Sequence, residues 1–154
     1  MQLICLLTSV PIRKEPISSS EKVSSLIFGE TCSVLEQVKD WVKIKSTLDG
    51  YEGYVSLERL TQFNPAIHQF NKRVFTPFVI AKSNTKRINI PCGAFIPESN
   101  TFEFENEKYV IDDTSDKEKN LIGLAHLFLN TPYNWGGRSI FGIDCSGLMQ
   151  LIFS

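Results

Sequence analysis

The sequence has almost no net charge, and its charges are not sorted by sign along the chain. Sixteen Lys and Arg residues stand against seventeen Asp and Glu residues in 154 residues, which gives a net charge of −1. No stretch gathers the basic residues into a stripe that could neutralise a phosphate backbone. We therefore do not expect nucleic acid as a partner.

Long hydrophobic runs are also missing. No run approaches the roughly 20 apolar residues that cross a bilayer. The apolar start MQLICLLTS lacks the basic region and the small-residue cleavage site of a secretory signal, and Pro11 and Arg13 soon interrupt it. We expect no membrane span and a cytoplasmic protein; a trimmed N-terminal segment would instead allow a periplasmic or secreted one.

Cysteine and histidine are scarce. The four cysteines form no C-x-x-C pair and no cluster with histidine at metal-ligand spacing, so neither a metal nor another cofactor is expected. Cys5, Cys32 and Cys92 fit small apolar core positions on strands. An apolar fraction of 42% is that of a globular protein, which we expect to be a monomer.

Short apolar runs separated by turn residues fill residues 1–61. Gly29, Lys39-Asp40 and Asp49-Gly50 separate these runs. The pattern predicts a small antiparallel β-barrel. The expected strands cover residues 4–10, 23–28, 31–35, 41–44 and 51–55.

A looser version of the same pattern occupies residues 62–113. LIFGETCSVLE in the first unit recurs faintly as NIPCGAFIPES in the second, which indicates a degenerate duplication of one barrel. The expected strands cover residues 75–81, 88–90, 94–96, 101–104 and 108–111.

The pattern changes to a helical one in residues 114–154. Ser115 and Glu118 have the spacing of a capping box, and Pro132 disfavours helical backbone at the residue before it. Between them, apolar residues recur at the spacing of one helix face: Leu121, Leu124, Ala125 and Phe128.

A glycine-rich loop then leads into Asp144-Cys145-Ser146-Gly147 and the apolar run 148–153. If Asp144 or Ser146 caps a helix here, Cys145 lies in its first turn. There the unpaired N–H groups and the positive end of the helix dipole favour a thiolate. Since a cysteine at such a place more often serves packing than catalysis, position alone leaves both roles open.

The surrounding residues carry a family resemblance. Pro132-Tyr133, Trp135-Gly136-Gly137 and Asp144-Cys145-Ser146-Gly147 resemble the signature of the NlpC-type (p-sixty) cell-wall cysteine peptidases, a papain-like superfamily. The upstream units look like the bacterial SH3-like domains that often precede this catalytic unit. The resemblance implies an α+β protein. Two small SH3-like β-barrels, residues 1–61 and 62–113, would precede the N-terminal helical part of a papain-like catalytic domain, residues 114–154.

The resemblance also implies a reaction. The runs SVPIRKEP, GETCSVLE, DWVKI and DGYEGYV are similar to the first domain of peptidases that cleave γ-D-glutamyl–diamino acid bonds during murein recycling. The expected partner is a murein-derived peptide with a free N-terminal L-alanine. Cys145 would be the nucleophile, Tyr133 would lie near the oxyanion, and Asp144 and Ser146 would receive the alanine amine.

In the same subgroup the first barrel lends an acid and a tyrosine to the blind end of the cleft. By position these would be Glu15 and Tyr51, with Tyr54 as the alternative tyrosine, and Trp135 would be a rim aromatic. Each residue also has a structural interpretation. Glu15 fits a loop charge, and both tyrosines are good strand residues.

A cysteine peptidase needs a histidine base near its thiol, and no histidine follows Cys145 in this sequence. His68 and His126 are expected to be structural. We therefore expect that part of the catalytic domain is absent and that this chain alone is inactive. The alternatives are a non-catalytic module that binds peptides or wall fragments, and an acyltransferase or amidase on the same scaffold.

Overall fold

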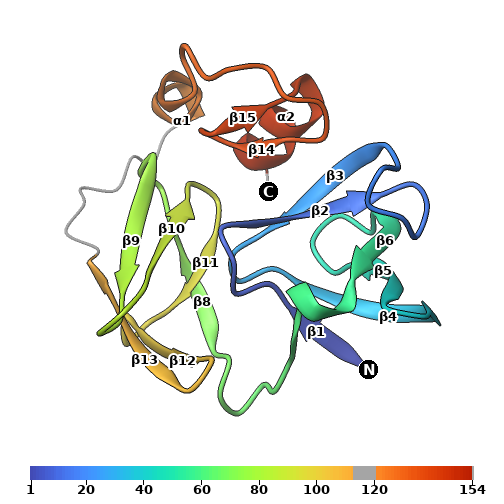
Figure 1. Cartoon of the computed structure of the whole chain (residues 1–154). Helices are drawn as coiled ribbons and strands as arrows, with labels where there is room; N and C mark the ends of the chain where they lie inside the picture. The colour runs from blue at the N-terminus through green and yellow to red at the C-terminus, as the bar shows by residue number, and fades with distance from the viewer. Residues whose placement is uncertain (113–120, 154) are drawn as a thin grey trace.

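The computed structural model of the chain describes residues 1–112 and 121–153. Two β units are followed by a segment that contains both helices (Figure 1). The described part is mostly β-strand with two short helices, as the α+β expectation requires. The expected capping box of Ser115 and Glu118 lies outside the described residues.

The first β unit, residues 2–62, is one antiparallel sheet of seven strands in the order β3-β2-β6-β5-β4-β1-β7. Alternation in β5 shows why it folds this way: Val42 and Ile44 are buried in the core of the unit, and the lysines between and after them are not. A short 3-10 helix, Leu57–Arg59, precedes the last strand. The strands are β1 Gln2–Ile4, β2 Ser9–Arg13, β3 Lys22–Ile27, β4 Thr31–Val38, β5 Trp41–Ser46, β6 Glu52–Ser56 and β7 Thr61–Gln62.

Four of the five strands expected in this unit are confirmed to within three residues at each end, and the first is not. The run 4–10 is divided between β1, which pairs with β4 and β7, and β2, which pairs with β3 and β6. Cys5 and Leu6 in the connection are also buried. Because burial continues through the corner, the apolar pattern does not reveal the break.

The second β unit, residues 70–112, consists of a four-stranded sheet in the order β10-β9-β13-β12 and a two-stranded sheet of β11 and β8. The strand β8 was not predicted, since Phe70 is its only apolar residue. The strands are β8 Phe70–Arg73, β9 Phe78–Lys82, β10 Arg87–Pro91, β11 Phe95–Pro97, β12 Thr101–Phe104 and β13 Glu107–Asp112.

The C-terminal segment, residues 121–153, lies across one end of the molecule (Figure 1). It contains α1 Leu121–Leu127, the two-residue strands β14 Arg138–Ser139 and β15 Gly142–Ile143, and α2 Cys145–Phe153. The short strand β14 contacts β3 of the first β unit. One core cluster is shared by the three parts, because it includes side chains of both β units together with four from this segment: Leu124, Phe128, Ile143 and Leu151. Neither described helix has the length and apolar character that a membrane crossing requires.

Gly29 allows the first β unit to approach the second, and replacing it tests that contact. Its φ is +80°, and a Cβ at this position would collide with the backbone carbonyl of Phe95. Gly50 has a similar φ of +71° but only the flexible side chain of Lys45 nearby. We expect Gly50→Ala to lower the free energy of unfolding by about 1 kcal/mol and Gly29→Ala by about 3 kcal/mol. Urea unfolding of both variants checks this, and equal losses would contradict the close contact.

Candidate active site

Cys145 is the first residue of α2, and it differs from the other cysteines in its exposure. Its side chain is exposed, whereas Cys5, Cys32 and Cys92 are buried as expected, although only Cys32 lies on a strand. Burial raises the pKa of Cys32 to about 12 and the pKa of Cys92 to about 11. Among the four thiols, Cys145 is therefore the one that can meet a substrate.

The Asp144 carboxylate caps the helix that carries Cys145. Its Oδ1 accepts hydrogen bonds from the Gly147 backbone N–H at 2.7 Å and from the Ser146 hydroxyl at 2.8 Å. Its carbonyl accepts the first helical hydrogen bond, from Leu148 N–H at 3.0 Å. This is the expected N-cap arrangement, and it leaves the Cys145 N–H at the open end of the helix.

The same carboxylate also holds the loop in front of the helix. Oδ2 accepts a hydrogen bond from Gly136 N–H at 2.8 Å, and Asp144 N–H donates to the Gly137 carbonyl at 3.2 Å. Burial alone would raise the pKa of Asp144. The hydrogen bonds that its carboxylate accepts from Gly147, Gly136 and Ser146, together with the charge of Lys22, outweigh burial and lower the pKa. Asp144 is therefore an anion at neutral pH and has one acceptor position left on Oδ2.

A cavity of about 200 Å³ lies beside Asp144, between the C-terminal segment and the first β unit. Four of the residues expected to bind substrate line it: Tyr51, Trp135, Asp144 and Ser146. They come from the end of the β5–β6 turn, from the glycine-rich loop and from the start of α2. Val23, Ser24, Gly136, Arg138 and Gln150 complete the lining.

Two side chains of the loop hydrogen-bond to the edge of the first β unit. Trp135 Nε1 donates to Glu21 Oε1 at 3.1 Å, and Lys22 Nζ donates to Asn134 Oδ1 at 3.0 Å. These contacts fix the wall of the cavity that Trp135 forms. They also place an ammonium group near the Asp144 carboxylate.

The remaining predicted site residues lie elsewhere. Tyr54 lines a neighbouring cavity that shares Tyr51 and Val23 with the first one. Glu15 is exposed in the β2–β3 connection, outside the lining of both cavities as far as the structure describes the chain. Tyr133 is 69% exposed, and its backbone forms a bridge with Ile143, two residues before Cys145.

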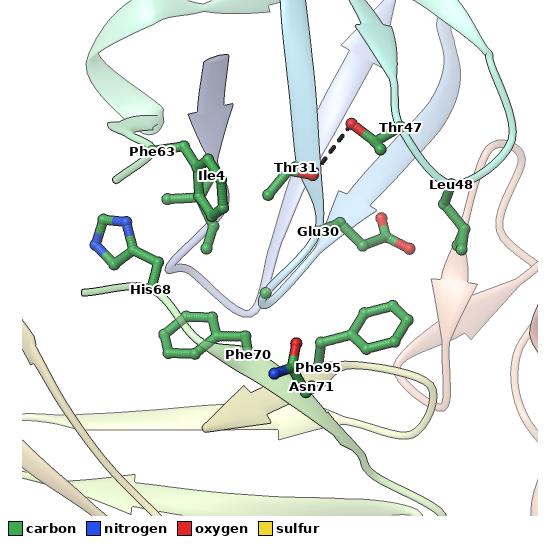
Figure 2. Close-up of a pocket in the computed structure, with 11 residues that line it drawn as sticks. Ile4, Glu30, Thr31, Thr47, Leu48, Phe63, His68, Phe70, Asn71 and Phe95 are labelled. Atoms are coloured by element: carbon green, nitrogen blue, oxygen red, sulfur yellow. Dashed lines mark hydrogen bonds between the residues drawn. The ribbon is translucent and has the colours of Figure 1, made fainter. Parts of the chain in front are cut away.

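Neither histidine lines the cavity beside Asp144. His68 belongs to a different cavity, of about 340 Å³, where Phe63 and Phe70 flank it (Figure 2). There its Nδ1 accepts a hydrogen bond from Asn64 N–H at 2.9 Å, and burial lowers its pKa. His126 is exposed on α1.

One pair of functional interest was not predicted from the sequence. Arg138 and Glu30 form a buried ion pair between the glycine-rich loop and the first β unit, with two hydrogen bonds of 2.9 Å. The partners are separated by 108 residues, and neither lies in a periodic pattern. Only the folded structure brings these two residues together.

Cys145 is thus exposed at a capped helix N-terminus, a position that favours a thiolate. Its two neighbours, Asp144 and Ser146, line the cavity, whereas Cys145 itself is not among the lining residues. Comparison with known proteins connects this geometry to a family. Residues 8–61 match the bacterial SH3 domain, and residues 130–154 match the NlpC/P60 family. The resemblance predicted from the sequence is thus confirmed.

Two curated relatives and one solved structure are similar to the chain. It is 26% identical over 153 residues to the gamma-D-glutamyl-L-lysine dipeptidyl-peptidase of Bacillus subtilis (strain 168), covering 84% of the chain and 52% of that protein. It is 22% identical over 187 residues to dipeptidyl-peptidase 6 of Lysinibacillus sphaericus, covering 99% of the chain and 69% of that protein. The chain thus spans between half and about two thirds of these relatives' lengths.

The solved structure supports the fold. An NlpC/P60 family protein from Bacillus cereus ATCC 10987 superposes with a TM-score of 0.77 at 17% sequence identity, covering 99% of this chain and 72% of that one. The described part of the chain therefore has an NlpC/P60-like fold.

Asp144 variants separate capping from charge. We expect Asp144→Ala to lower the free energy of unfolding by about 1 kcal/mol, because the cap is lost. Asp144→Asn keeps one oxygen for the cap but removes the charge and the oxygen that accepts the Gly136 N–H. The folded-state pKa is lowered, so the charge stabilises the protein above the unfolded-state pKa of about 3.9, and this stability is lost as the pH falls through the folded-state value.

The difference in stability between wild type and Asp144→Asn should therefore shrink below about pH 4. Urea unfolding across pH measures it. Asp40→Asn, which changes an exposed aspartate between β4 and β5, is the control. If the difference in free energy of unfolding between wild type and Asp144→Asn stays constant with pH, the charge of Asp144 does not contribute to the cap.

Proposed function

We propose that the protein is a cysteine peptidase of the NlpC/P60 type that acts on murein peptides with Cys145 as its nucleophile. The observation that carries the proposal is the place of Cys145: it is exposed, at a capped helix N-terminus, and between two residues that line a cavity. Relatives named as dipeptidyl-peptidases support it. A cytoplasmic, monomeric enzyme stays a prediction from the sequence.

We further propose that residues 1–61 and 62–113 are two SH3-like domains, the second degenerate, and that residues 114–154 belong to the catalytic domain. The match of residues 8–61 to the bacterial SH3 domain supports the first assignment. The second rests on the β-rich unit of residues 70–112 and on the repeated sequence pattern. The third rests on the NlpC/P60 match.

The proposed substrate carries a free N-terminal L-alanine and is cut between γ-D-glutamate and a diamino acid. The free acceptor position of Asp144 and the Ser146 hydroxyl suit an ammonium group. Tyr51 and Trp135 supply aromatic walls. A cavity of about 200 Å³ is smaller than sites for larger ligands, which span roughly 300–1,000 Å³, and this favours a small N-terminal residue.

In the proposed reaction the Cys145 thiolate attacks the γ-glutamyl carbonyl carbon. A C–S bond forms and the carbonyl oxygen becomes an oxyanion, for which Cys145 N–H and the Tyr133 hydroxyl are the proposed donors. The C–N bond then breaks, the diamino acid amine leaves with a proton, and water hydrolyses the thioester. A base must move these protons, and in papain-like sites that base is histidine.

Labelling with an electrophilic substrate analogue tests the nucleophile and the amine site together. We expect L-Ala-γ-D-Glu chloromethyl ketone to label Cys145 about tenfold faster than its N-acetylated form, because only the free amine pairs with Asp144. Mass spectrometry of the native protein identifies the labelled residue and gives both rates.

Two variants make the labelling experiment specific. Cys145→Ser should abolish labelling, and Asp144→Asn should remove the preference for the free amine. Equal rates for the free and acetylated compounds, or labelling at another residue, would contradict the proposed substrate site.

We expect the 154-residue chain by itself to show no peptidase activity. Neither of its histidines lines the cavity beside Asp144, since His68 belongs to a separate cavity and His126 is exposed on α1, and we therefore expect no histidine base for Cys145. Release of L-Ala-D-Glu from L-Ala-γ-D-Glu-L-Lys, followed by chromatography, measures this. Turnover that His126→Ala or His68→Ala abolishes would show that one of these residues is the base.

A further inference from the structure

A buried ion pair links the first β unit to β14, in the segment that precedes Cys145. Arg138 Nη1 and Nη2 donate to the two carboxylate oxygens of Glu30, each at 2.9 Å, and the two side chains are only 2% and 1% exposed. Arg138 Nη1 also donates to the Ser25 carbonyl at 2.9 Å. Glu30 in addition accepts a hydrogen bond from Ile27 N–H at 3.0 Å.

Arg138 of this pair is adjacent in sequence to the groups that hold the glycine-rich loop. Arg138 directly follows Gly136-Gly137, and the Gly136 carbonyl accepts a 2.7 Å hydrogen bond from the Ser25 hydroxyl. Gly136 N–H in turn donates to Asp144, which caps the helix of Cys145. A continuous set of hydrogen bonds thus runs from β3 and the following turn to the N-terminus of α2.

Stability alone does not account for such a pair. Removing two charges from water costs several kcal/mol per ion, and replacing a buried ion pair by well-packed apolar residues of similar volume is often neutral or stabilising. Unlike apolar contacts, the planar guanidinium group makes two directional hydrogen bonds to a carboxylate. These two hydrogen bonds fix the relative orientation of the two side chains. Burial raises the pKa of Glu30, and the Arg138 charge and the Ile27 N–H oppose this rise.

We propose that Glu30 and Arg138 are positioning residues for Cys145. The pair fixes the glycine-rich loop against the first β unit, so that Asp144 stays on the helix N-terminus and the thiol stays at its open N–H groups. The inference rests on the proposed role of Cys145 as nucleophile. It adds that a residue of the first β unit, remote in sequence, sets the reactivity of that thiol.

Alkylation by iodoacetamide tests the proposal without a substrate, and the buried positions of the other three cysteines make it specific for Cys145. We expect Glu30→Gln and Arg138→Lys to slow alkylation at about pH 7 roughly tenfold, because the thiolate loses its place at the helix N-terminus. Gly147 N–H donates a hydrogen bond to Asp144, and its hydrogen exchange should accelerate in both variants.

Matched variants separate positioning from stability. Val42→Ala removes a fully buried side chain from the core of the first β unit, in a cluster that contains neither Glu30 nor Arg138. It should lower Tm but leave the alkylation rate unchanged. If the single variants do not fold, Glu30→Leu with Arg138→Met replaces the pair by apolar groups of similar volume. This double variant should fold and still alkylate slowly.

Each outcome decides one point. Slow alkylation in the pair variants, with a wild-type rate in Val42→Ala, supports the positioning role. If wild-type alkylation is fast and remains equally fast in Glu30→Gln and Arg138→Lys, or in the double variant, the positioning role is overturned. The proposed function then still stands. Wild-type alkylation as slow as that of a free peptide thiol would instead contradict the nucleophile itself.

Discussion

The Asp144 carboxylate is the group on which the arrangement of the site depends. One oxygen caps the helix that begins at Cys145, and the other holds the loop that reaches the first β unit. Because both tasks use the same side chain, the start of the helix and the loop that lines the cavity are held together. An anion at this point also provides the charge that an ammonium group of a substrate would meet.

Around this carboxylate, parts far apart in sequence meet in three ways. A shared apolar core joins both β units to α1 and α2. Hydrogen bonds of Trp135 and Lys22 connect the glycine-rich loop to the edge of the first β unit, and the buried Glu30–Arg138 pair connects β14 to the same unit. Burial of apolar side chains stabilises the fold, while the hydrogen bonds and the ion pair fix the orientation of the parts that they connect. The first β unit thereby forms one wall of the site.

Structural features that depend on local chemistry could be predicted from the sequence. Asp144 before an apolar run indicated the capped helix, and turn residues located most strands. The break between β1 and β2 escaped prediction because the chain stays buried through it, and β8 because it carries one apolar residue. The Glu30–Arg138 contact could not be predicted, since no local rule pairs two charges 108 residues apart.

A crystal structure of the chain with the dipeptide L-Ala-γ-D-Glu would show where the proposed substrate binds relative to Asp144 and Cys145. We expect the alanine amine at Asp144 Oδ2, the ligand between Tyr51 and Trp135, and the γ-carboxyl group facing the Cys145 sulfur. A dipeptide bound instead in the separate cavity between the two β units, among Phe63, Phe70 and Phe95 (Figure 2), would contradict this expectation.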